Sequence, residues 1–391
     1  MTLDVAVIGT GPEPERAGGV GYAMGYRHAS AYRAIDGCEL VACVDIERAN
    51  AEAFAEHYDI DDRRVYEDHE SMLAGAEPDL VSVCTPVTTH ADIVADCAAA
   101  GVEAIHCEKP MAHTWADCKR MVETCEEAGV RLTINHQRRF AGPFRQAKLL
   151  LDDGAIGELE RVKIGGKNLY DFGTHMFDMC HYVTDGASPE WVRSLLVYDE
   201  ENVRYGVHNE NRAMAEWEYE NGVEGFAETG SADRDCLMRL EGDEGTIEIG
   251  HSNGASLRTK AADESEWTRI DTGGERVSHV AVDPGLPVKV LRKLDDATPG
   301  PQVFRPLADR VFMADEDPFL KPYVRRALQE VVDATIEDRE SPLAAGNALE
   351  STELIFGCWE SARQQERVEL SLEIEDNPLT AMVDNGRFRP N

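Results

Sequence analysis

The first 134 residues alternate short apolar runs with longer amphipathic segments, and this alternation constrains the fold more than any other feature. The apolar runs have the length of buried strands, and they fall at 3–8, 40–44, 80–84, 102–107 and 130–134. The segments between them have helical spacing, and they fall at 28–34, 49–58, 89–100 and 115–128. Strands that alternate with helices in this way predict a parallel, doubly wound sheet of the Rossmann type.

A glycine pair follows the first strand directly, because Gly9 and Gly11 flank Thr10. Glycines at this turn let the backbone approach a pyrophosphate on the amino terminus of the next helix, so the pattern indicates dinucleotide binding. The third glycine is displaced, since 13 residues separate Gly25 from Gly11. Residues 12–24 are therefore interpreted as an inserted loop, which either folds over the cofactor or decorates the edge of the domain.

Asp45 stands at the end of the second strand. An acid at this position hydrogen-bonds the adenosine ribose of NAD and would repel the 2′-phosphate of NADP. The same residue could instead cap the helix that follows. Because strand, helix, strand and acid occur in the required order, we favour the ribose role and expect NAD in preference to NADP.

Glu108 and Lys109 follow the apolar run at 102–107, just before Pro110. Ligands of open α/β sheets bind at the carboxyl ends of the strands, which is where this acid and this base would lie. A lysine there can hold a substrate oxygen, and a glutamate can accept hydrogen bonds from a ribose. A solvated ion pair in a loop is the competing interpretation.

After Asn135 the pattern changes, and short strands dominate. One helix is expected at 143–151, and strands are expected at 159–164, 191–197, 213–219, 223–229, 237–240, 246–249 and 256–259. The turn at 220–222 is a hairpin signal, so this sheet should be mostly antiparallel. An irregular stretch at 283–322 precedes two helices, at 323–337 and 344–363. We expect a Rossmann domain over 1–134 and an α+β domain with an open sheet over 135–391.

A second polar group lies in this half, at Asp171, His175 and Asp178. If a helix begins near Asp171, the three side chains share one face, and the aspartate can stabilise the charged histidine as an acid–base unit. In the alternative interpretation, an aspartate caps the helix and His175 is a core histidine whose hydrogen bonds are made within the protein. A metal site is disfavoured, because Lys109 would bring a competing positive charge, and we expect no metal.

The combined pattern resembles the glucose-fructose oxidoreductase/inositol dehydrogenase/MocA family over roughly residues 3–370. The landmarks that carry the resemblance, in chain order, are Gly9-Thr10-Gly11, Met24-Gly25 with His28, Asp45, Thr85-Pro86 with His90, Glu108-Lys109-Pro110, Asn135 with Arg138-Arg139-Phe140, and Asp171-x-Gly173-x-His175. The sequence departs from the family in its stretched glycine loop, in Val87 where asparagine is common, and in a tail after Leu370. The departure at the loop bears on pyrophosphate contacts rather than on the fold.

The resemblance implies a role for each landmark. Lys109, Asp171 and His175 would be catalytic, and Glu108 would lie near the nicotinamide ribose. The cofactor site would comprise Gly9, Thr10, Gly11, Gly25, Asp45, Thr85, Pro86, His90, Glu108 and Lys109. The substrate would meet Lys109, Asp171 and His175 together with four further polar residues, Arg138, Arg139, Asn168 and Tyr170. The open sheet of such proteins commonly builds dimers or tetramers, so a homodimer or homotetramer is expected.

The expected activity is NAD-dependent oxidation of a secondary alcohol on a sugar, cyclitol or related polyol, or the reverse reduction. His175 would act as the base, and Lys109 would stabilise negative charge on the substrate oxygen. Two alternatives remain open from the sequence. One is a hydrolase or lyase that retains NAD through its cycle, and the other is a non-catalytic sensor of cofactor or sugar.

The chain carries 74 acidic and 39 basic residues, for a formal net charge of −35. Such a surface repels nucleic acids and anionic membranes, and it is typical of proteins from salt-accumulating halophiles. Ten cysteines without a C-x-x-C pair indicate reduced, buried thiols. No run of 18 apolar residues and no basic amino-terminal segment stands out, so we expect a cytoplasmic protein without a membrane span.

Overall fold

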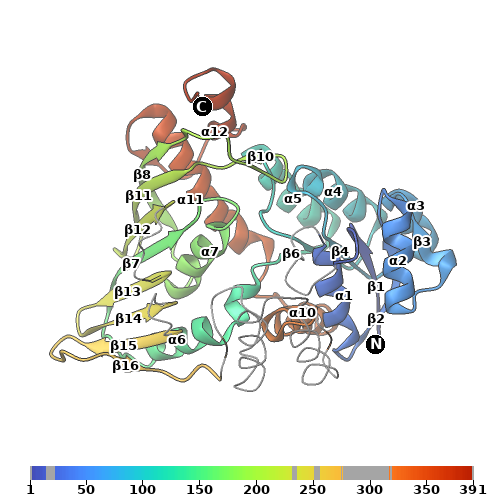
Figure 1. Cartoon of the computed structure of the whole chain (residues 1–391), viewed down its shortest axis with the longest axis horizontal. Helices are drawn as coiled ribbons and strands as arrows, with labels where there is room; N and C mark the ends of the chain where they lie inside the picture. Colours follow the sequence, from blue (N-terminus) through green and yellow to red (C-terminus); the bar gives the residue numbers. More distant parts are fainter. Residues whose placement is uncertain are drawn as a thin grey trace, which may run out of the picture.

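The computed structural model describes residues 2–14, 23–230, 236–250, 256–273, 275, 317 and 319–389. Two lobes lie side by side, each built on its own sheet (Figure 1). The blue and cyan lobe holds a six-stranded sheet, and the green and yellow lobe holds a nine-stranded one. The expected inserted loop at 12–24 and the irregular stretch at 283–322 fall largely outside the described residues.

The first sheet is parallel throughout, with the strand order β3-β2-β1-β4-β5-β6. Its strands are β1 (Leu3–Ile8), β2 (Cys38–Val44), β3 (Val65–Tyr66), β4 (Leu80–Val83), β5 (Ala104–Cys107) and β6 (Arg131–Ile134). The strands β4 and β5 are buried along their whole length, as expected for a sheet covered on both faces. The expected doubly wound Rossmann sheet is confirmed.

Five α-helices connect these strands, namely α1 (Met24–Arg33), α2 (Arg48–Tyr58), α3 (His69–Ala76), α4 (His90–Ala100) and α5 (Trp115–Ala128). Short 3-10 turns, η2 (Asp62–Arg64) and η3 (Val87–Thr89), precede β3 and α4. Gly101 and Gly129 end α4 and α5 with positive φ angles of 80° and 70°, a conformation that glycine adopts without strain. The pair β3 and α3 was not anticipated, because a two-residue strand leaves no periodic signal.

The second sheet has the order β16-β15-β14-β13-β7-β12-β11-β8-β17, and β7 with β12 is its one parallel pair among the described residues. Its strands are β7 (Leu159–Gly166), β8 (Pro189–Val197), β11 (Arg212–Tyr219), β12 (Glu224–Thr229), β13 (Met238–Gly242), β14 (Gly245–Ile249), β15 (Leu257–Ala261), β16 (Thr268–Arg269) and β17 (Val368–Glu369). A separate ribbon pairs β9 (Val203–Arg204) with β10 (Val207–His208). The mostly antiparallel open sheet is confirmed, and β11 and β12 form the hairpin expected around Gly222.

Helices cover one face of this sheet. They are α6 (Gly142–Asp152), α7 (Thr174–Val183) and α11 (Ala345–Gln364), and the 3-10 turn η4 (Gln137–Phe140) precedes α6. The short helix α12 (Pro378–Asp384) packs on α11. Figure 1 shows α7 and α11 between the large sheet and the first lobe. The opposite face of the large sheet has no described helix over it.

The helix α10 (Pro322–Ile336) returns to the first lobe. Its buried Leu328 and Val331 share a hydrophobic cluster with Leu3 of β1 and Tyr32 of α1. A single β-bridge, between Thr133 and Ala344, adds a backbone contact. The division between 134 and 135 therefore stays a prediction, because α10 follows the boundary in sequence but packs on the first lobe. In the described ranges, no helix has the length and apolar character needed to cross a bilayer.

Candidate active site

Glu108 lies buried at the carboxyl end of β5, where three groups bind its carboxylate. Nδ2 of Asn135 donates to Oε1 at 2.6 Å, and Nε2 of His28 lies 2.9 Å from the same oxygen. The backbone N–H of Lys109 donates to Oε2 at 3.1 Å. Burial alone would raise the pKa of Glu108, but the hydrogen bonds and nearby positive charge outweigh it and lower the pKa to about 2. Glu108 is therefore a fixed anion.

Lys109 reaches from the first lobe to the second. Its Nζ donates to the backbone oxygen of Asp171 at 2.8 Å and to Oδ1 of Asp171 at 3.1 Å. The side chains of Lys109 and Asp171 are 18% and 23% exposed, so the ion pair is mostly buried but still accessible to solvent. The structure thus brings together two of the expected catalytic residues, which stand 62 positions apart in sequence.

The helix expected to begin near Asp171 begins at Thr174, so the prediction of one helical face shared by Asp171, His175 and Asp178 was wrong. Asp171 lies in the turn before α7, while His175 is buried in its first turn. The reason is local: Oδ1 of Asn168 accepts the backbone N–H of Phe172 at 2.8 Å, and this hydrogen bond holds the chain in a separate turn ahead of the helix.

Asp178 faces a different group of residues. Its carboxylate accepts hydrogen bonds from Nε and Nη2 of Arg139 at 3.0 and 2.7 Å, and Nδ1 of His136 lies 3.0 Å away. Burial would raise the pKa of Asp178, but Arg139 and His136 hold it well below its usual range. Arg139, expected to contact substrate, has its charge matched inside the protein.

The other expected substrate residues are Tyr170, Asn168 and Arg138, and they differ in the contacts that hold their side chains. Tyr170 is buried, and its hydroxyl donates to the backbone oxygen of Ala112 at 2.5 Å. Asn168 is also buried and supports the turn described above. Arg138 rests on the ring of Phe172, with its guanidinium carbon 4.6 Å from the ring centroid. Among these residues, Arg138 alone carries a charge that no described carboxylate matches.

Two residues that the sequence did not point to, Asn209 and Glu210, anchor the turn that carries Asp171. Oδ1 of Asn209 accepts the backbone N–H of Asp171 at 3.0 Å, and Oε1 of Glu210 accepts that of Leu169 at 2.6 Å. Glu210 also accepts from Nε1 of Trp359 at 3.2 Å and from the hydroxyl of Thr229 at 3.3 Å. No periodicity or motif marks this pair, because its function lies entirely in contacts distant in sequence.

The glycine loop after β1 is held by Asp45. The hydroxyl of Thr10 and the backbone N–H of Gly11 donate to Oδ2 of Asp45 at 3.1 and 2.7 Å. Gly9 has a φ of +87°, and a Cβ added there would lie 2.8 Å from the methyl carbon of Thr85. A Cβ on Gly25 would lie 3.0 Å from the backbone oxygen of Gly9. These close approaches of strand, loop and helix are what a dinucleotide-binding turn requires, so the residues fit NAD.

His90 ties the loop after β4 to the loop after Lys109. Its Nε2 lies 2.9 Å from the backbone oxygen of Thr85, and its Nδ1 lies 3.1 Å from those of Pro110 and Met111. Burial lowers the pKa of His90, although the backbone carbonyl groups beside it act in the opposite direction. The structure therefore places His90, Thr85 and Pro86 beside the glycine loop, and their cofactor contacts stay a prediction.

Comparison with known proteins matches residues 16–136 to the model of an oxidoreductase family with an NAD-binding Rossmann fold. Residues 158–370 match the carboxyl-terminal alpha/beta domain of the same family. The chain belongs to the Gfo/Idh/MocA oxidoreductase family. Its first domain is the NAD-binding domain of that family, and its cofactor is NAD.

Similar proteins of known activity include two sugar dehydrogenases. D-apiose dehydrogenase of Paraburkholderia graminis is 27% identical over 276 residues, which cover 62% of this chain and 71% of that protein. D-glucoside 3-dehydrogenase of Escherichia coli is 31% identical over 201 residues, which cover 46% of this chain and 54% of that protein. The chain thus spans only about half the length of the second relative.

A solved oxidoreductase from Agrobacterium radiobacter, in complex with NAD+, L-tartaric acid and magnesium, has the same fold. It superimposes with a TM-score of 0.69, at 19% identity, over 94% of this chain and 98% of that one. At this identity the likeness establishes the fold alone.

The buried carboxylate of Glu210 predicts a pH-dependent stability. Its binding partners are neutral donors, and burial raises its pKa to about 7 from a model-compound value of 4.5. The folded state therefore holds the proton more tightly than the unfolded state. Its stabilising contribution is complete below about pH 4.5 and is lost as the pH rises through about 7, with a size of about 3 kcal/mol.

We expect the Glu210→Gln variant to lack this component, because glutamine stays neutral. Urea unfolding at pH 5 and pH 8 should show that the free energy of unfolding of the wild type falls between these values by about 3 kcal/mol more than that of the variant. Glu200→Gln, at an exposed position, is the matched control and should follow the wild type. An equal pH dependence in wild type and Glu210→Gln would contradict the assignment.

Proposed function

We propose that this protein catalyses hydride transfer between NAD and a secondary alcohol of a sugar, cyclitol or related polyol. The observation that carries the proposal is the hydrogen bond from Nζ of Lys109 to Oδ1 of Asp171, at 3.1 Å. This contact joins the first lobe, which binds NAD, to the second lobe. The sugar dehydrogenases among the relatives support this substrate class.

The chemistry requires a proton acceptor and a cation at the substrate oxygen. An alcohol carbon releases hydride only as its hydroxyl loses a proton, so the two transfers are linked. NAD, when bound, accepts the hydride. The ammonium of Lys109, fixed by Asp171, holds the substrate oxygen and stabilises the negative charge that develops there. His175 accepts the hydroxyl proton and passes it to solvent, which leaves a ketone.

Substitutions of Lys109 and His175 should separate catalysis from cofactor binding. Lys109→Met should lower kcat by about 10²- to 10³-fold, and His175→Ala by about 10²- to 10⁴-fold. The Kd for NAD should change less than about threefold in both, because both residues would face the substrate side of the nicotinamide. Formation of reduced nicotinamide, followed by absorbance over a panel of sugars and cyclitols, is the measurement.

Lys119→Met on α5 is the matched control for the loss of a lysine, and it should retain wild-type turnover. Parallel loss of NAD affinity and rate in Lys109→Met would assign Lys109 a folding role. Product formed without any net change in reduced nicotinamide would favour the hydrolase or lyase that retains NAD.

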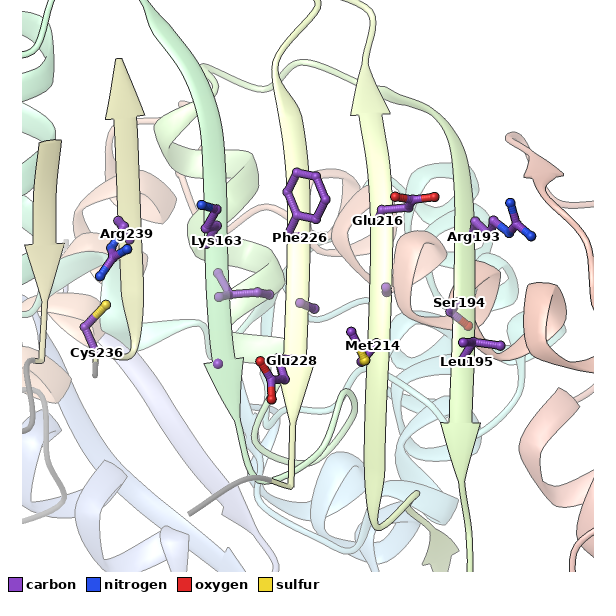
Figure 2. Close-up of a pocket in the computed structure, with 14 residues that line it drawn as sticks. Lys163, Arg193, Ser194, Leu195, Met214, Glu216, Phe226, Glu228, Cys236 and Arg239 are labelled. Carbon is purple, nitrogen blue, oxygen red and sulfur yellow. The ribbon is translucent and has the colours of Figure 1, made fainter. Parts of the chain in front are cut away.

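We further propose that the protein forms a homo-oligomer through the open face of the large sheet. Figure 2 shows this face, where Leu195 of β8 and Met214 of β11 are cross-strand neighbours that are 74% and 64% exposed. A hollow of about 600 Å³ runs beside them. Contiguous exposed apolar side chains of this kind mark interaction surfaces.

The charges on this face favour a second copy of the chain as the occupant. The same hollow is lined by three bases, Lys163, Arg193 and Arg239, and by two acids, Glu216 and Glu228. In a chain with almost twice as many acids as bases, the residues that line this hollow thus carry no net negative charge. In a two-fold contact, bases of one copy can meet acids of the other.

Placing a charge at the centre of this face should dissociate the assembly. The double variant Leu195→Glu/Met214→Glu should elute as a monomer in size-exclusion chromatography with light scattering, whereas the wild type should be a dimer or tetramer. Leu149→Glu, at a 54% exposed position on α6, is the control and should keep the wild-type mass. An unchanged mass in the double variant, or a monomeric wild type in 1 M KCl, would contradict the proposal.

A further inference from the structure

Arg138 is a buried cation without a carboxylate partner in the described part of the chain. The residue is 7% exposed. Its Nη1 lies 3.4 Å from the sulfur of Met176, and its guanidinium carbon lies 4.6 Å from the centroid of the Phe172 ring. Burial lowers the pKa of Arg138 to about 10, which still leaves the side chain charged at neutral pH. A guanidinium has five N–H donors, and a thioether sulfur and an aromatic ring are weak acceptors for them.

The adjacent residue shows that the fold can match a buried arginine when stability requires it. Arg139 donates two hydrogen bonds to Asp178, at 3.0 and 2.7 Å. Acids are also abundant, with 74 in the chain against 39 bases. A buried charge without a partner is destabilising, so residues of this kind are retained where a ligand supplies the counter-charge.

The contacts of Arg138 place it beside the proposed substrate site. Phe172 directly follows Asp171 in the turn, and Met176 directly follows His175 in α7. Arg138 itself stands three residues after Asn135, which binds Glu108. The guanidinium thus lies against the segment that carries two of the three proposed catalytic residues.

We propose that Arg138 binds a carboxylate of the substrate, so that the preferred substrate is a sugar acid or other polyhydroxy acid and not a neutral polyol. A guanidinium can donate two parallel hydrogen bonds to a carboxylate, which fixes orientation as well as charge. The secondary alcohol to be oxidised would then lie at Lys109, with the carboxylate held at Arg138. This inference rests on the proposed function, which defines where the substrate lies.

Binding to matched pairs of probes tests the inference independently of turnover. D-gluconate and D-glucitol form one pair, and D-galacturonate and D-galactose form another, each titrated into the enzyme saturated with NADH. We expect the acid of at least one pair to bind about tenfold or more tightly than its neutral partner. In Arg138→Met this preference should disappear, and in Arg138→Lys it should return in part, because lysine keeps the charge but not the paired donors.

Thermal unfolding without ligand distinguishes a ligand-binding role from a structural one. Removing an unmatched buried charge should raise the Tm of Arg138→Met by roughly 2–4 °C. Arg145→Met, which removes an exposed arginine of α6, is the control and should change neither the Tm nor the probe preference.

Acids that bind no more tightly than their neutral partners would overturn the inference, as would a preference that survives in Arg138→Met. A fall in the Tm of Arg138→Met together with an unchanged preference for acids in that same variant would assign Arg138 to the fold. Preferential binding of acids without hydride transfer to any probe would leave this inference standing and count against the dehydrogenase proposal instead.

Discussion

A buried carboxylate at the end of β5 organises the site. Glu108 draws in His28 from α1 and Asn135 from the end of β6, so three elements of the first lobe converge on one anion. Glu108 is buried within the first lobe, whereas the next residue, Lys109, reaches Asp171 in the second lobe. The two adjacent residues thus serve different lobes.

A second buried carboxylate, that of Glu210, positions residues of the second lobe. Glu210 accepts a hydrogen bond from the backbone N–H of Leu169, and its neighbour Asn209 accepts one from that of Asp171. These two hydrogen bonds fix the turn that contacts Lys109. The two acids differ in their partners. Glu108 has a histidine and a lysine nearby and keeps its charge, while Glu210 has neutral donors and a raised pKa. One carboxylate thus shapes the electrostatics of the site, and the other shapes its geometry.

The features that depend on local periodicity could be predicted from the sequence, and those that depend on distant contacts could not. The alternating runs of the first half identified the parallel sheet, and the strand end at Cys107 placed Glu108 and Lys109 at its functional edge. The prediction for the start of α7 was wrong, because the turn before it is held by Asn168 within the turn and by Asn209 and Glu210 from a distant part of the chain.

Arg138 and Arg139 illustrate the same limit at the level of single residues. They are identical and adjacent in sequence, and both were expected to contact substrate. In the folded chain Arg139 meets Asp178, 39 positions away, whereas Arg138 meets an aromatic ring and a sulfur. No sequence pattern distinguishes the arginine that stabilises the fold from the one left available to a ligand.

The central claim is that Lys109 and Asp171 act as one catalytic unit across the two lobes. A double-mutant cycle on the rate of hydride transfer in a single turnover tests it most directly, with Lys109→Met, Asp171→Asn and the combined variant. If the residues act together, their effects are not additive, and the combined variant should be slower than Lys109→Met by less than about threefold. Losses that multiply in the combined variant would show that the two residues act independently and would contradict the account.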